Sequence, residues 1–365
     1  MRRDHATRGF RPIDRPSVGS RRDPVRREVF VTGHDRCNVN RVLLPPNERK
    51  RATVYGPRDK TRYSSPHNAE LNRVGDGCLR RRMSMKTITA SAARKLGKFL
   101  ANDFHEIFGP THDKLAERIG SLARITIECI GRSDALYHNY EHTWLVTMVG
   151  RDILQGLTMS RRIEPSDYTH LIIACLLHDI GYVRGILSGD TGDEFVVGAN
   201  GCRIALPRGA SDASLTPYHV DRSKLFAIER LGNSPGIDVE RIAEAIEYTR
   251  FPPSPERKTT DADILPRLVQ AADLIGQLGD PMYAKKVNAL FYEFEEIGMN
   301  RQLGYSSPAD LVDKYPEFFW NSVSMHLDEG IKYLNLTVSG RQWIANLHHH
   351  VLCAENAQRL MGPQP

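Results

Sequence analysis

Two histidine-containing segments have the residue types and spacing of a metal site. The first, YHNYEH, places His138 and His142 four residues apart. The second, LLHDIGY, places His178 next to Asp179, and a third segment, QAADLIG, offers the carboxylate of Asp273. Imidazole and carboxylate groups without thiolates suit one or two divalent ions such as Mn²⁺, Mg²⁺, Zn²⁺ or Fe²⁺.

The chemistry that such a site would serve is hydrolysis of a phosphate ester. A bound divalent ion lowers the pKa of its water to about 7 and so supplies hydroxide at neutral pH. The alkoxide that leaves a phosphodiester needs a proton, which a histidine beside the metal but not bound to it can donate. We expect His138 to have this role.

The combination of Y-H-N-x-x-H, a buried L-L-H-D and a helical A-D resembles the HD-domain metal-dependent phosphohydrolases. The closest likeness is to the catalytic domain of the cyclic nucleotide phosphodiesterases, and it covers roughly residues 110–340. The resemblance implies a single all-α domain, with His138 as general acid and Asp179 as a catalytic carboxylate shared by two ions. The metal ligands that it implies are His142, His178, Asp179 and Asp273.

Other polar residues near these motifs have less specific interpretations. His219 is the one histidine between Asp179 and Asp273. It is either an additional metal or substrate ligand or a loop residue near Asp221.

Several further polar clusters are expected to be structural. Asp190, Asp193 and Glu194 are expected to be solvated loop carboxylates, and Glu141 to complement a helix N-terminus. The run His348–His350 suggests metal binding, but consecutive residues of a helix point in different directions, which favours a structural role.

The periodicity of apolar residues predicts the helices that must position these groups. In a helix from about Thr87, residues Ala93, Leu96, Leu100 and Phe104 form one apolar face. Further helices are predicted at about 113–130, from Tyr140, from Ser166, at 220–231 and 239–249, from Asp263, and at about 281–297, 316–336 and 338–360.

Two segments between these helices have special features. The run LIIACLLHDIGY is apolar nearly all round, which predicts a buried helix containing His178 and Asp179 as polar groups that need partners. Residues 183–218 form a long connection with six glycines, which is typical of a lid or binding loop. Within it, EFVVGANGCRIAL predicts a small hairpin with its turn at residues 198–201.

Charge divides the chain into two parts. Residues 1–85 carry 21 Lys and Arg against 9 Asp and Glu, whereas residues 86–365 carry 29 against 35. The first part has no periodic apolar pattern, so we expect a disordered basic extension over 1–85 and one helical domain over 86–365. Met83 and Met85 stand just before the first helical sequence, which suggests the hypothesis that the native chain begins there.

Six cysteines without a Cys-x-x-Cys spacing indicate free thiols and a cytoplasmic protein. No apolar run approaches the roughly 20 residues that span a bilayer. The expected partner is a small phosphate ester, nucleotide-like, rather than a membrane or a nucleic acid.

The sequence therefore predicts a metal-dependent phosphodiesterase or phosphohydrolase. Two alternatives stay open. A di-iron oxygenase could use the same helical scaffold, although it would need more histidines around the iron pair. A non-catalytic binding module could retain the pocket without turnover.

Overall fold

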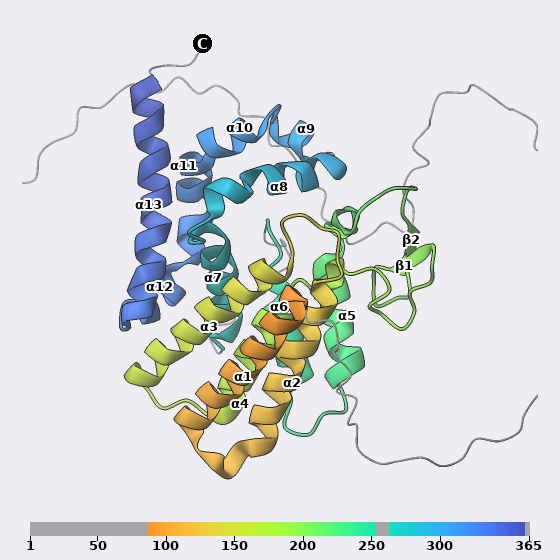
Figure 1. Cartoon of the computed structure of the whole chain (residues 1–365), viewed down its shortest axis with the longest axis vertical. Coiled ribbons are helices and arrows are strands. Elements are labelled where there is room, and N and C mark those ends of the chain that lie inside the picture. Colours follow the sequence, from red (N-terminus) through yellow and green to blue (C-terminus); the bar gives the residue numbers. More distant parts are fainter. Residues whose placement is uncertain (1–86, 253–262, 362–365) are drawn as a thin grey trace, which may run out of the picture. The chain divides into compact units, whose positions relative to one another are not determined.

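The computed structural model describes residues 87–252 and 263–361, and the predicted extension over 1–85 lies outside them. In the described part, the regular elements are thirteen α-helices, a few short turns and one hairpin (Figure 1), which confirms the all-α class. The helices are α1 (Ile88–Phe108), α2 (Asp113–Ile130), α3 (Tyr140–Ser160), α4 (Pro165–Leu177), α5 (His219–Leu231), α6 (Val239–Glu247), α7 (Leu265–Leu278), α8 (Tyr283–Glu296), α9 (Met299–Leu303), α10 (Pro308–Asp313), α11 (Tyr315–Phe318), α12 (Asp328–Leu334) and α13 (Val338–Met361).

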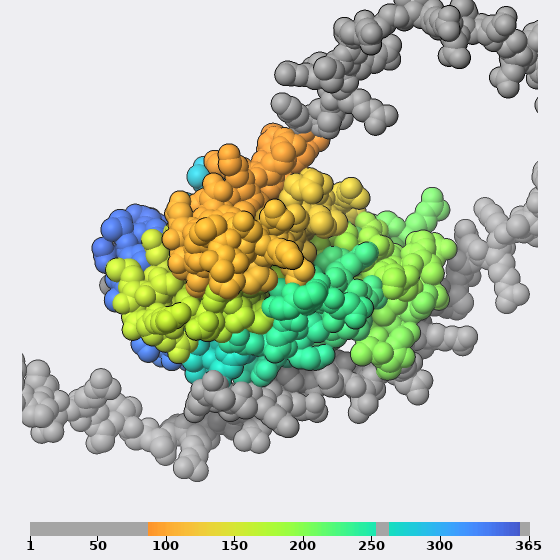
Figure 2. Space-filling view, turned by 90° about the horizontal axis from the view of Figure 1, so that it is seen from below, coloured from red at the N-terminus to blue at the C-terminus, as the bar shows by residue number. Residues whose placement is uncertain are grey.

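The first two helices form a closely packed pair. The predicted apolar face of α1 is fully buried, and α2 has the predicted bounds. The two backbones meet at Gly97 and Gly120, where a Cβ on Gly97 would lie 2.4 Å from the carbonyl oxygen of Gly120. Figure 2 shows the side chains of α1 and α2 as one contiguous orange surface beside the green surface of α5 and α6.

Helices α3, α4 and α7 contact one another in every pairing and form the centre of the described domain. Every residue of α4 from Tyr168 to Leu177 is buried, as its uniformly apolar sequence predicts. Helix α7 approaches α3 where Gly276 faces Val146, and a Cβ on Gly276 would lie 2.9 Å from the Val146 Cα. This glycine therefore sets the spacing between the two helices.

The end of α4 differs from the prediction. We expected His178 and Asp179 to lie within the helix, but α4 ends at Leu177 and a 3₁₀ turn follows at Ile180–Tyr182. Tertiary hydrogen bonds replace the helical ones here. The Gly181 N–H donates to Ser223 Oγ at 2.9 Å, and the Gly181 carbonyl accepts from Arg222 Nε at 2.7 Å.

The single helix predicted at 316–336 is also wrong, because the chain forms α11, a π-helical turn (Phe319–Val323), a 3₁₀ turn (Ser324–His326) and α12. The apolar residues that suggested one helix repeat every four positions, which is longer than the 3.6-residue period of an α-helix. A wider turn keeps Phe319, Val323 and Leu327 on one buried face.

Residues 183–218 are connected to the helices by hydrogen bonds and an ion pair. The predicted hairpin is present, with β1 (Glu194–Val196) antiparallel to β2 (Arg203–Ala205). Asp190 is not the solvated carboxylate that we expected. Its side chain is fully buried and pairs with the equally buried Arg222 at 2.9 Å. Arg222 also donates to the carbonyls of Val183 and Val196. These bonds attach the first part of the segment to α5.

The other physical expectations have mixed outcomes. No helix among the described residues is long and apolar enough to cross a membrane. Cys129, Cys175 and Cys353 are free thiols, as predicted. Cys202 is disulfide-bonded, which corrects the expectation for that residue.

We predict that Gly276→Ala lowers the free energy of unfolding by about 1–3 kcal/mol, because the new methyl group meets backbone atoms of α3 that cannot move alone. Chemical denaturation measures the change. Gly192→Ala is the matched control, because nothing lies within 4 Å of a Cβ there, and its effect should stay within about 0.5 kcal/mol. Equal stability of the two variants would contradict the tight α3–α7 approach.

Candidate metal centre

The beginning of α3 fixes the two histidines of the first motif in different settings. The side-chain oxygen of Asn139 caps the helix by accepting from the N–H groups of Glu141 at 2.9 Å and His142 at 3.4 Å. His138 therefore precedes the helix, and His142 lies in its first turn, buried against the core. The predicted start of this helix at Tyr140 is confirmed.

The end of α4 turns both residues of the second motif toward His142. His178 directly follows Leu177, the last residue of α4, and its Nδ1 donates to the Cys175 carbonyl at 2.8 Å. This bond leaves the Nε2 lone pair directed at the cluster. Asp179 has left helical geometry, with φ −109° and ψ 4°, so adjacent residues can face one point.

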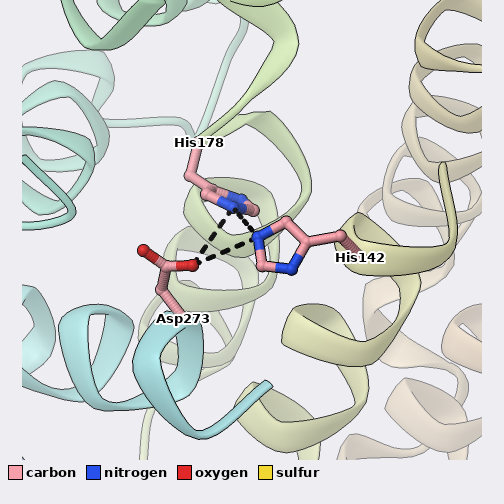
Figure 3. Close-up of side chains that lie close together, drawn as sticks. All are labelled: His142, His178 and Asp273. Carbon is pink, nitrogen blue, oxygen red and sulfur yellow. Dashed lines mark hydrogen bonds and ion pairs between the residues drawn. The ribbon is translucent and has the colours of Figure 1, made fainter. Parts of the chain in front are cut away.

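Four ligand atoms from three elements converge at this point. His142 Nε2 and His178 Nε2 are 3.3 Å apart. Asp179 Oδ2 lies 3.3 and 3.1 Å from these two nitrogens, and Asp273 Oδ1 from α7 lies 3.3 and 3.5 Å from them. Figure 3 shows His142, His178 and Asp273 pointing toward one another, and these three residues could hold a metal ion.

The donor set fits a divalent cation on two grounds. Ligand atoms about 2.0–2.2 Å from one ion lie roughly 3–3.5 Å from one another, and the separations between each imidazole nitrogen and the other ligand atoms are 3.1–3.5 Å. In addition, Asp179 Oδ2 is a buried oxygen that makes no hydrogen bond, although it lies close to both imidazoles. A buried carboxylate oxygen without a hydrogen bond is costly unless a charge balances it.

The electrostatics of the cluster favour a bound positive charge. Burial lowers the pKa of His142, but the carboxylates of Asp179 and Asp273 outweigh this effect and raise it to about 10. Burial raises the pKa of Asp179, but the imidazoles of His178 and His142 hold it well below its usual range. Without a cation the site therefore holds a proton, and a cation must displace it.

His138 stands beside the ligands and is held by a residue that the sequence analysis missed. Its Nδ1 lies 2.5 Å from Oε2 of Glu293, a carboxylate of α8 that is 2% exposed. Glu293 Oε1 also accepts from the N–H groups of Tyr137 and His138, at 2.6 and 3.1 Å. The available signal was the position of Glu293 directly between two aromatic residues, Tyr292 and Phe294.

His219 also belongs to the cluster. It is the first residue of α5, its Nδ1 donates to the Thr216 carbonyl at 2.6 Å, and its Nε2 lies 3.7 Å from Asp179 Oδ1. Burial lowers the pKa of His219. A neutral imidazole thus turns a lone pair toward a carboxylate oxygen, an arrangement that a cation between them would stabilise.

The remaining polar candidates do not converge here. Asp193 and Glu194 are exposed, and Glu141 is paired at the surface with Lys286 at 3.2 Å. In the histidine run, His350 contacts the Asp280 carbonyl at 2.9 Å and His348 is exposed.

The chain belongs to the Npun_R2479-like family, whose model matches residues 89–357. The match thus covers nearly all of the described helical domain, including every candidate ligand. Comparisons with curated proteins and with solved structures give no match.

We predict that His178→Ala and Asp273→Asn each lower the affinity for Mn²⁺ by at least about tenfold, because the first removes a ligand atom and the second replaces an anionic carboxylate by a neutral amide. Titration calorimetry measures the affinity. His348→Ala is the matched control and should bind Mn²⁺ as the native protein does. Loss of binding in the control, or unchanged binding in both site variants, would contradict the assignment.

We also predict that Mn²⁺ binding releases at least one proton between pH 6 and 8, because the pKa of His142 is about 10 without a cation. The affinity should then rise by about tenfold for each pH unit. Calorimetry in two buffers with different ionisation enthalpies counts the protons. Binding without proton release would show that His142 carries no proton before the metal binds.

Proposed function

We propose that this protein is a metal-dependent hydrolase of phosphate esters that acts on a nucleotide-like phosphodiester or phosphomonoester. Two neighbouring features support the proposal. The first is the cluster of four candidate ligands, His142, His178, Asp179 and Asp273. The second is His138, which lies beside this cluster but is bonded to Glu293 and is not one of the candidate ligands. The likeness of the Y-H-N-x-x-H and H-D motifs to HD-domain phosphohydrolases agrees with this proposal. The proposed location is the cytoplasm.

The four ligands would hold one divalent cation, with His219 and the second oxygen of Asp179 as candidates for another. Such an ion supplies a hydroxide nucleophile at neutral pH, because it lowers the pKa of a coordinated water to about 7. The burial of His142, His178 and Asp179 keeps bulk water away from the ligand atoms.

His138 is the proposed general acid. In hydrolysis, a water oxygen bonds to phosphorus, the bond to the leaving oxygen breaks, and the proton on His138 Nε2 passes to that oxygen. Glu293 orients the ring through Nδ1 and stabilises its positive charge. Burial raises the pKa of Glu293, but His138 and two backbone N–H groups lower it below its usual value, so Glu293 stays ionised at neutral pH.

The decisive experiment is a screen of Mn²⁺-loaded protein against cyclic nucleotides, deoxynucleotide phosphates and bis(4-nitrophenyl) phosphate. We expect hydrolysis of at least one class, lost in Asp179→Ala. A metal-loaded protein that hydrolyses none of them would overturn the proposal. Oxygen consumption by the iron-loaded protein would point to a di-iron oxygenase, and metal binding without either activity to a binding module.

We predict that His138→Ala retains Mn²⁺ but loses about 10²–10⁴-fold in kcat on alkyl phosphodiesters, because their alkoxide leaving group requires protonation. Release of 4-nitrophenolate, a weak base, should fall much less. Rates with both substrates and the metal content measure the effect.

Glu293→Gln should show the same preference in milder form, since the ring keeps a hydrogen-bonding partner but loses the charge. Glu296→Gln is the matched control, because this exposed carboxylate of the same helix accepts hydrogen bonds from Ser211 and Ser214 at the surface and contacts none of the candidate ligands in the described part of the chain. It should retain the native rates. Full activity of His138→Ala on alkyl diesters would remove the acid assignment.

A further inference from the structure

Tyr182 lies between two histidines that no sequence motif connects. It ends the 3₁₀ turn that begins next to Asp179, and its side chain is 1% exposed. Its ring stacks on the His138 ring, with centroids 4.7 Å apart and planes at 12°. The same ring stacks on His219, with centroids 4.5 Å apart and planes at 23°.

Each of these imidazoles has a hydrogen bond at one edge, and the His138 ring also meets the rings of Tyr137 and His142 edge to face, at centroid distances of 5.2 and 5.6 Å. His138 Nδ1 is bonded to Glu293, and His219 Nδ1 to the Thr216 carbonyl. One hydrogen bond at one ring atom does not by itself prevent the ring from rocking about that bond, and this rocking moves Nε2. A flat partner on the ring face restricts that motion, because tilting the imidazole would break the stacking contact.

The backbone that carries Tyr182 has little freedom to move. Its N–H donates to the Asp179 carbonyl at 3.1 Å. The preceding residue, Gly181, is pressed so closely against α5 that an added Cβ would lie 2.0 Å from the His219 carbonyl oxygen. One short turn therefore carries both a candidate ligand and the ring that restrains the neighbouring histidines.

We propose that Tyr182 is a positioning residue that fixes the orientation of His138, and with it the path of the proton to the leaving group. The inference rests on the proposed function. Because the ring restrains His138 through its face, we expect the aromatic plane to matter more for the proton path than the hydroxyl group, which is hydrogen-bonded with Thr216. The stacking of Tyr182 on His219 likewise holds His219 Nε2 near Asp179 Oδ1, at 3.7 Å.

The test compares Tyr182→Phe with Tyr182→Leu on two phosphodiesters that differ in their leaving group. Tyr182→Phe keeps the ring and should retain kcat within about threefold on both. Tyr182→Leu should lose at least about tenfold in kcat on an alkyl diester but at most about threefold on bis(4-nitrophenyl) phosphate, with little change in KM. Metal content by atomic emission should be the same in all three proteins.

A variant that only loses stability should slow both substrates to the same extent. Tyr168→Leu is the matched control for this effect. Tyr168 is equally buried, but it lies in α4 and donates to Asp103. Its replacement should lower the melting temperature and slow both substrates in equal proportion. The inference is overturned if Tyr182→Leu also slows both substrates equally, or if Tyr182→Phe is as impaired as Tyr182→Leu. Failure of the proposed function itself would appear differently, as inactivity of the native protein on both diesters.

Discussion

The structure depends on the convergence of two imidazoles and two carboxylates in a place that water hardly reaches. His142, His178 and Asp179 are each less than one-twentieth exposed. Buried ionisable groups of this kind are costly unless their charges and lone pairs are balanced. The contacts within the cluster balance them only in part, because Asp179 Oδ2 makes no hydrogen bond. A proton reduces the imbalance when no cation is present, and a divalent cation would remove it more fully.

The fold delivers these groups from the ends of elements rather than from their middles. His142 enters just after the cap of α3, and His178 and Asp179 occupy the point where the chain leaves α4. Asp273, in contrast, comes from the middle of α7, and Gly276 one turn later lets that helix approach α3. Helix ends suit this task because the backbone there can direct adjacent side chains to one place. The tight interior contacts then hold those ends at a fixed separation.

The sequence allowed much of this to be predicted, and the omissions have physical causes. The start of α3 and the burial of α4 follow from a capping residue and from uniform hydrophobicity, which are local properties. The end of α4 is decided by Ser223 and Arg222, which are distant in sequence and hydrogen-bond to Gly181. Glu293 and Asp190 were overlooked or misjudged for the same reason. Their burial is explained only by partners that the fold brings to them, His138 in one case and Arg222 in the other.

The two oxygens of Asp179 connect the parts of the site. Oδ2 faces His142 and His178, whereas Oδ1 faces His219. His219 in turn stacks on Tyr182, and Tyr182 on His138. A shift of Asp179 would therefore disturb the cation ligands and the rings on its other side together. This arrangement makes the position of the proposed acid dependent on the same short turn that supplies a ligand. The proposed cation and the proposed proton donor would then keep a constant separation even if the surrounding helices moved slightly.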